Sequence, residues 1–417
     1  MPRHYKCISG DSHLDIRPER WTSRVPKRWR GRAPRTVILA NGNEGILVEN
    51  RPPRSPGATT ITGIPYEKHG LQKYWFEGPG TGAAEQRLWE QDQDGVDAEV
   101  LFSHGSYAEF WRGISDDDAY KAVIRAYNEW LAEEYCGYNR NRIIGMGVIP
   151  DTGVEDAIAE MEYCAKAGLK GINLHRFPSG KGYVTPQDDK FWTAALDLNV
   201  PVTSHTNGGT TRLGPKNGPI FQYPGVKTTG AERDPVSLMF RFAGEQPIAP
   251  LQMAMAGVFD RFPNLKIYWA ESQAGWLPYS FDQIDDNHER NRYWGGRDYG
   301  FKAPVRKPSE YLKENCLWGF MRDPWAVKCR HEIGLEILIW GSDFAHATGD
   351  WPNSQKIIDQ TFAGVNAEER HKMLTGNVVR FFHLDAAADL DASGRAMQGG
   401  RLGNDPTIAS SGLRASR

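Results

Sequence analysis

The chain alternates short apolar runs with longer amphipathic stretches, and this alternation restricts its fold more than any other feature. Eight runs rich in β-branched and aromatic residues have the length and flanks of strands, and helix-like stretches separate them. Strands that are apolar on both faces indicate a parallel sheet covered on both sides. Eight strand–helix units close a (β/α)8 barrel, so we expect this α/β fold, a TIM barrel, with a doubly wound open sheet as the alternative. The expected strands are residues 6–13, 97–105, 142–150, 170–176, 200–207, 265–272, 316–321 and 336–344, and expected helices include residues 116–139, 153–168, 186–199, 251–263, 275–291 and 367–382.

Two long irregular insertions interrupt the alternation, after the first and the fifth expected strands. Residues 42–81 are rich in Pro, Gly and Arg, and residues 206–234 are rich in Gly and Thr. Both follow a strand, so they would lie at the C-terminal face of the barrel, where substrate loops are carried. The chain ends in a small, polar, Gly- and Ser-rich stretch. We therefore expect a barrel domain, residues 1–384, and a C-terminal extension, residues 385–417, that serves as an oligomer arm.

Charge and cysteine content restrict the class of partner and the compartment. The chain has 50 basic and 52 acidic residues, a formal net charge of −2, and no basic block, so we expect no nucleic-acid partner. No apolar run approaches membrane-spanning length, so we expect no membrane contact. The five cysteines are scattered without a CxxC pair, which is typical of reduced thiols in a cytoplasmic protein.

Acidic and histidine residues gather at the ends of the expected strands. Residues i and i+2 of a strand point to the same face, so Asp11 and His13 can bind one ion together. In a barrel, the C-terminal ends of distant strands meet at one mouth. The ordinary alternative is that Asp11 caps a turn and that each histidine makes a hydrogen bond at its strand end. The strand-end positions are Asp11 and His13 (first strand), His104 (second), His175 (fourth), His205 (fifth), Glu271 (sixth) and Asp343 (eighth).

Several longer motifs point to a known family. They are SGDSHLDIRPERW, EQDQDGVDAEVLF, AYNEWLAE, LNVPVTSHTNGG, FPNLKIYWAESQAGWLPYSFDQID, GSDFAHATGDWPNS and TGNVVRFFHL. In these motifs and their order the chain resembles the amidohydrolase-related family, the branch of the metal-dependent amidohydrolase superfamily that includes aminocarboxymuconate-semialdehyde and resorcylate-type decarboxylases. The resemblance covers most of residues 6–384. It implies metal binding by Asp11, His13, His205 and Asp343, and it implies that His346 lies near the site.

The chain departs from the family pattern at two positions. The first-strand motif is Asp11-x-His13, where the family often has His-x-His or Glu-x-His. After the sixth strand many members carry an acid/base histidine, and this chain has Glu271. A glutamate is an anion at neutral pH unless burial raises its pKa. We therefore expect Glu271 to act as a base or as an additional metal ligand.

The implied set of ligand atoms limits which metal ions the site can bind and which reactions they can assist. Two imidazole nitrogens and two carboxylates suit Zn2+, with Mn2+ or Fe2+ as alternatives, and one ion is expected, with a second as an alternative. The ion would lower the pKa of a bound water or polarise a substrate oxygen. Asp343 would be both a ligand and a proton acceptor, with Glu271 and His346 as further catalytic residues. The candidates for substrate binding are His175, Arg176 and Trp276.

Three functions are consistent with these residues. The first is a metal-dependent hydrolase or decarboxylase that acts on a small carboxylate-bearing or aromatic substrate. The second is an Fe- or Mn-dependent hydroxylase of the same fold that uses O2, with one or two ions. The third is a non-catalytic barrel that stabilises a related catalytic subunit. The resemblance implies dimers, so we expect a homo-dimer or higher oligomer, with a hetero-oligomer containing a related subunit as the alternative.

Overall fold

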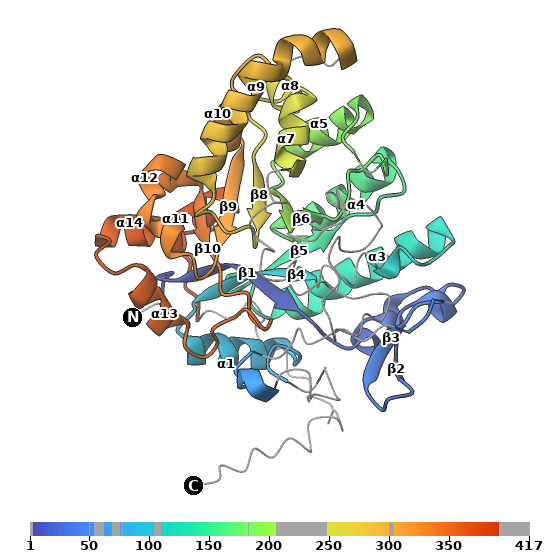
Figure 1. The fold of residues 1–417 in the computed structure, drawn as a ribbon. Helices are drawn as coiled ribbons and strands as arrows, with labels where there is room; N and C mark the ends of the chain where they lie inside the picture. Colours follow the sequence, from blue (N-terminus) through green and yellow to red (C-terminus); the bar gives the residue numbers. More distant parts are fainter. Residues whose placement is uncertain are drawn as a thin grey trace, which may run out of the picture.

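The computed structural model describes residues 3–49, 51–53, 62–68, 76, 78–103, 110–181, 183–205, 248–299 and 304–391. Eight parallel strands form the centre of the molecule, and helices surround them (Figure 1). Each strand overlaps one of the eight expected strands, so the predicted barrel is confirmed. In sheet order the strands are β1 Ile8–Leu14, β4 Ala98–Ser103, β5 Ile143–Val148, β6 Gly171–Leu174, β7 Val202–His205, β8 Ile267–Ala270, β9 Cys316–Phe320 and β10 Leu338–Trp340.

The barrel closes where the end of β10 meets β1. Phe344 forms a parallel bridge with Ser12, the His13 amide donates to the Phe344 carbonyl at 2.5 Å, and the Asp343 amide donates to the Asp11 carbonyl at 2.9 Å. A Cβ at Gly341 would lie 2.6 Å from Asp11 Cβ, so only glycine permits this close approach. This closure excludes the doubly wound alternative.

The helices cover the outside of the barrel and begin and end at recognisable signals. Asp116 caps α3 by accepting from the Ala119 amide, and Gly168 ends α4 in the left-handed conformation. The expected helix 251–263 is divided at Gly257, where φ is 69°. The α-helices are α1 Ala84–Asp94, α3 Asp117–Trp130, α4 Val154–Ala167, α5 Asp189–Asp197, α7 Ile248–Met255, α8 Val258–Arg261, α9 Leu277–Tyr299, α10 Pro308–Glu314, α11 Pro324–Lys328, α12 Arg330–Ile333, α13 Ser354–Thr361, α14 Ala367–His371 and α15 Asn377–Phe381.

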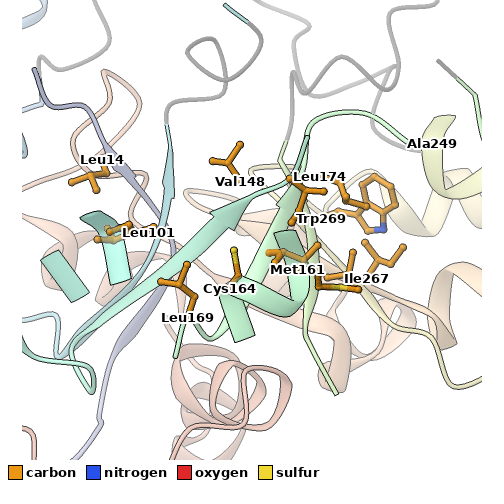
Figure 2. Packing of buried hydrophobic residues seen from close by; sticks show 14 of the residues in the cluster. Leu14, Leu101, Val148, Met161, Cys164, Leu169, Leu174, Ala249, Ile267 and Trp269 are labelled. Atoms are coloured by element: carbon orange, nitrogen blue, oxygen red, sulfur yellow. The ribbon is translucent and has the colours of Figure 1, made fainter. Parts of the chain in front are cut away.

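Two apolar layers hold the barrel together. The outer layer lies between strands and helices, and Figure 2 shows part of it, where Met161 and Cys164 of α4 pack near Leu174 of β6. The inner layer fills the barrel interior, with side chains such as Phe102, Met146 and Tyr268. The interior is therefore a packed core rather than a pore, and the polar strand-end residues stand at its C-terminal mouth.

A hairpin that was not expected from the sequence spans the start of the first insertion. Strands β2 Arg35–Ile38 and β3 Glu44–Leu47 pair antiparallel, so the prediction that residues 42–81 are irregular throughout is wrong for β3. The turn contains Asn41-Gly42, with Gly42 at φ 80°, and an Asn-Gly pair favours such turns. The second expected insertion, residues 206–234, lies outside the described residues.

The described part of the C-terminal extension packs under the barrel. The Leu390 amide donates to the Arg3 carbonyl at 3.0 Å, and Asn139 Nδ2 donates to the Leu390 carbonyl at 2.9 Å. Residues 392–417 lie outside the described residues, so their role as an oligomer arm stays a prediction. Among the described helices, none combines the length and the apolar composition needed to span a membrane.

Candidate active site

Four of the predicted ligands converge at the mouth of the barrel. Asp11 and His13 point to the same side of β1, His205 is the last residue of β7, and Asp343 follows β10. All four are buried, with exposed fractions of 0–6%. His205 Nε2 lies 3.3 Å from Asp11 Oδ1, and His13 Nε2 lies 3.6 Å from the same oxygen and 3.1 Å from Asp343 Oδ1. Residues separated by more than three hundred positions thus form one polar cluster inside an apolar barrel.

The geometry and chemistry of this cluster fit a divalent cation. Donor atoms that share a tetrahedral ion with bonds of about 2.0–2.1 Å lie about 3.3 Å apart. Three separations within the cluster, 3.1–3.6 Å, are close to this value, and they fall in two triplets that share His13: Asp11–His13–His205 and His13–Asp343–His346. Asp11 Oδ2 is buried and accepts no hydrogen bond from any residue that the structure describes. Burial, together with His346 and His205, lowers the pKa of His13 to about 4, which keeps its imidazole in the neutral form that binds metals.

The backbone at the two acidic strand ends is strained. Glu271, directly after β8, has φ 53°, and Asp343 has φ 51°. This left-handed conformation costs a non-glycine residue of the order of 1 kcal/mol or more, and such strain is typical of functional sites. Gly349 packs against the carbonyls of Asp343 and His346, where a Cβ would lie 3.2 Å from each oxygen. The turn that carries Asp343 and His346 is therefore tightly fixed.

Glu271 lies on the His205 side of the cluster. Its side chain is 1% exposed, and Oε2 is 3.6 Å from His205 Nε2. The strand-end position thus brings a fifth buried donor next to the four predicted ligands. This placement is compatible with either role that we expected for Glu271, a base or an additional ligand.

His346 lies on the opposite side, against Asp343. Its ring stacks on the His13 ring with a centroid distance of 3.6 Å, and Nδ1 is 3.1 Å from Asp343 Oδ1. Burial opposes protonation of His346, but Asp343 and Asp15 outweigh it and raise its pKa to about 10. Burial likewise opposes ionisation of Asp343, yet His346 and His13 hold the pKa of Asp343 well below its usual value. Thr348 Oγ1 donates a short hydrogen bond to Asp343 Oδ2.

Asp15 is a further site residue, beyond those expected from the sequence. It is 2% exposed, and its Oδ2 lies 3.3 Å from His346 Nε2. His346 is therefore held between two carboxylates, those of Asp343 and Asp15. The signal was present in the sequence, because Asp11, His13 and Asp15 alternate and so share one side of the chain.

The three predicted substrate-binding residues have different surroundings. His175 is buried and lies 3.3 Å from Asn173 Nδ2, and burial, with contributions from His205 and Arg176, lowers its pKa to about 4. Arg176 is partly exposed, with Nε 3.6 Å from Asp151 Oδ2. Trp276 donates from Nε1 to the Ser272 carbonyl at 3.0 Å and packs edge-on against Trp318. Their roles stay predictions, and His104 lies outside the described residues.

Comparison with known proteins decides the family. The amidohydrolase family model matches residues 90–384. The chain belongs to the amidohydrolase family. It is 24% identical over 310 residues to the 2-amino-3-carboxymuconate-6-semialdehyde decarboxylase of Dictyostelium discoideum, covering 72% of this chain and 76% of the relative. It is 24% identical over 316 residues to a gamma-resorcylate decarboxylase of Polaromonas sp., covering 72% and 87%.

One solved structure of similar fold holds a metal. It is the 5-carboxyvanillate decarboxylase of Novosphingobium aromaticivorans in complex with manganese and 4-hydroxy-3-methoxy-5-nitrobenzoic acid. The TM-score is 0.62 at 19% identity, and the match covers 91% of this chain and 96% of that chain. The resemblance to the decarboxylase branch of the amidohydrolase-related family is thus confirmed, and so is the expected class of enzyme, a metal-dependent hydrolase or lyase.

Proposed function

We propose that this amidohydrolase is a decarboxylase that depends on a divalent metal and acts on a small aromatic carboxylate. The observation that carries the proposal is the buried cluster of Asp11, His13, His205 and Asp343 at the barrel mouth. The decarboxylases among its relatives support the reaction class, and the manganese-bound aromatic decarboxylase supports the substrate class.

Asp11, His13, His205 and Asp343 would hold the metal. When bound, the ion supplies positive charge that binds and polarises the substrate's carboxylate and a neighbouring oxygen. Zn2+ and Mn2+ both suit two imidazole and two carboxylate donors. The walls of the mouth contribute further binding, because His175 and Arg176 follow β6 at the same end of the barrel. We assign Arg176 to the substrate's anionic group, since a guanidinium pairs with carboxylates in a bidentate manner.

Loss of CO2 requires a proton at the ring carbon that bears the carboxylate. The carbon–carbon bond breaks, its electron pair stays with the ring carbon, and that carbon takes the proton. We assign the donor to His346, whose side chain is 12% exposed and flanked by Asp343 Oδ1 at 3.1 Å and Asp15 Oδ2 at 3.3 Å. Two carboxylates hold a proton on the imidazole, and His346 contacts two of the proposed metal ligands, Asp343 and His13. The proton source is therefore next to the expected substrate position.

Glu271 would perform the opposite transfer. A glutamate at this strand end accepts a proton instead of donating one, and the side chain lies 3.6 Å from His205. We assign it to deprotonation of a substrate hydroxyl, the group that lies beside the carboxylate in hydroxybenzoates. Acid and base thus stand on opposite sides of the cluster, with His346 toward β10 and Glu271 at the end of β8.

The test is CO2 release by purified enzyme with a panel of hydroxybenzoates, including gamma-resorcylate and 5-carboxyvanillate, and with benzoate as the substrate without a hydroxyl. We expect turnover that requires bound metal, that is lost on Asp343→Asn, and that falls by about 10²-fold or more on His346→Asn. Thr152→Ala, whose hydroxyl bonds Asp156 outside the cluster, is the control and should leave turnover unchanged. Metal-loaded enzyme that releases no CO2 from any hydroxybenzoate would contradict the proposal.

A second candidate function has one observation in its favour. Two donor triplets, Asp11–His13–His205 and His13–Asp343–His346, each place three ligand atoms within 4.8 Å of one another. With Glu271 beside them, such a cluster has enough donors for two ions, as an Fe- or Mn-dependent hydroxylase that uses O2 would require. Two equivalents of iron per chain, with O2 consumption and no CO2 release, would favour the hydroxylase. One equivalent of metal and no O2 consumption would exclude it.

A further inference from the structure

A fully buried arginine lies behind the metal-binding cluster, at the seam where the barrel closes. Arg87 belongs to α1, and its side chain is 1% exposed. One terminal nitrogen donates to the His13 carbonyl at 2.9 Å, and the other lies within hydrogen-bond distance of the Phe344 carbonyl, at 3.3 Å. The guanidinium also lies over the Phe344 ring, 4.5 Å from its centroid. One side chain thus joins the backbone of β1 to the backbone that follows β10.

The charge of Arg87 is paired directly with a buried acid. Arg87 Nε donates to Glu99 Oε2 at 2.6 Å, and Glu99, on β4, is 2% exposed. Gln91 Nε2 donates to the same oxygen at 2.9 Å, and Ser12 Oγ donates to Glu99 Oε1 at 3.1 Å. Because Ser12 stands between Asp11 and His13, the ion pair contacts the ligand-bearing strand through both its backbone and a side chain.

Three serine hydroxyls continue this network across the seam. Ser9 Oγ lies 3.0 Å from both Ser12 Oγ and Ser342 Oγ, and the two latter oxygens are 3.2 Å apart. Ser9 Oγ also donates to the Asp11 carbonyl at 2.7 Å and accepts from the Ser342 amide at 2.8 Å. Ser342 directly precedes Asp343. This network therefore includes Ser12, between the ligands Asp11 and His13 of β1, and Ser342, next to the ligand Asp343 after β10.

The contribution of this network to fold stability does not by itself explain why the chain buries an ion pair here. Burying an ion pair removes two charges from water, and apolar side chains of similar volume often give equal or greater stability. What an apolar pair cannot provide is a fixed distance between two carbonyl groups on different strands. The two carbonyls that Arg87 contacts belong to His13 and to Phe344, the residue after Asp343. The side chains of His13 and Asp343 lie 3.1 Å apart.

We propose that Arg87 and Glu99 are positioning residues that set the spacing of the metal ligands His13 and Asp343. The inference rests on the proposed metal-dependent function and adds residues that contact neither metal nor substrate. Groups that orient ligands through hydrogen bonds typically change metal affinity 10- to 100-fold when they are replaced. Arg87 acts on ligands of two strands at once, so its effect should lie within this range.

The test compares metal affinity and fold stability in matched variants. Arg87→Lys keeps the charge but has one terminal nitrogen, so it reaches one carbonyl and not both. The double variant Arg87→Met/Glu99→Leu replaces the pair with apolar volume. The control is Arg125→Gln, which breaks another arginine–glutamate pair, Arg125–Glu160 at 2.8 Å, outside the cluster. The readouts are metal affinity in competition with a chromophoric chelator, the visible absorption of the Co2+-loaded protein, thermal unfolding of the metal-free protein, and kcat and KM.

We expect Arg87→Lys to bind metal at least 10-fold more weakly, with an altered Co2+ spectrum and a loss in kcat greater than the change in KM. The double variant should lose as much affinity while its metal-free form unfolds near the wild-type temperature. Arg125→Gln should retain wild-type affinity. Undiminished affinity and spectrum in Arg87→Lys, or an equal loss in Arg125→Gln, would overturn this inference alone. A wild-type chain that binds no metal would overturn the proposed function as well.

Discussion

The seam between β1 and β10 can be perturbed by one methyl group. The described structure places Gly341 so close to β1 that an added Cβ would lie 2.6 Å from Asp11 Cβ and 2.9 Å from the Asp11 amide nitrogen. The backbone of Gly341 lies outside the left-handed region, so alanine is conformationally permitted there. Gly341→Ala therefore changes the contact with Asp11 and leaves local backbone preference almost unchanged.

The size of the effect follows from these distances. Ordinary contacts of a Cβ begin at 3.4 Å, so the two strands would have to separate by about 0.8 Å. Metal–ligand distances tolerate deviations of about 0.2 Å. A displacement of Asp11 several times larger should weaken metal binding by about 10- to 100-fold, and the strain should lower the free energy of unfolding by about 1–3 kcal/mol.

The assay is metal affinity by chelator competition together with urea unfolding of the metal-free protein. Gly31→Ala serves as the control, because a Cβ at Gly31 has no atom within 4 Å in the described structure, and it should leave both quantities unchanged. A Gly341→Ala protein with wild-type affinity and stability would refute the close approach of β10 to Asp11 and with it the geometry of the cluster.

Three further predictions concern an acid outside the cluster, the base and the metal. Burial raises the pKa of Asp94 from 3.8 to about 6, so ionisation of Asp94 destabilises the fold as pH rises from about 4 to about 6. In urea titrations, Asp94→Asn should therefore raise the free energy of unfolding by up to about 3 kcal/mol at pH 7 and by little at pH 4. Equal effects at both pH values would contradict this prediction. Glu271→Gln should lower kcat by about 10²-fold or more while the protein retains its bound metal. Loss of metal in this variant would show that Glu271 is a ligand, and an unchanged kcat would exclude both the base role and the ligand role. Chelation should lower the unfolding temperature, and Mn2+ or Zn2+ should restore it; an unfolding temperature that does not respond to chelator would argue against a structural contribution from the metal.

Much of the fold and the candidate ligand cluster could be predicted from the sequence because both follow simple periodicities. The eight strands are continuous apolar runs, and a parallel barrel brings all their C-terminal ends to one mouth. Asp11 and His13 share a side of β1 because strand side chains alternate. His205, Glu271 and Asp343 each follow an apolar run, and the structure brings all of them together.

What could not be predicted depends on packing between distant segments. The sequence places Arg87 on a helix and Glu99 on a strand, but only the docking of α1 against the seam brings the two charges together. Asp15 shares a side of the chain with His13, yet its contact with His346 depends on the turn after β10. The hairpin of β2 and β3 had a local signal in Asn41-Gly42, but its strands are short and were not distinguished from the surrounding insertion.

The central claim is that Asp11, His13, His205 and Asp343 bind a divalent cation together. The most direct test is elemental analysis of the purified chain beside its Asp11→Asn and His205→Ala variants. The account predicts a stoichiometric divalent metal in the wild-type chain and less than a tenth of that amount in each variant that remains folded. A folded wild-type chain without stoichiometric metal, or variants that retain it in full, would contradict the account.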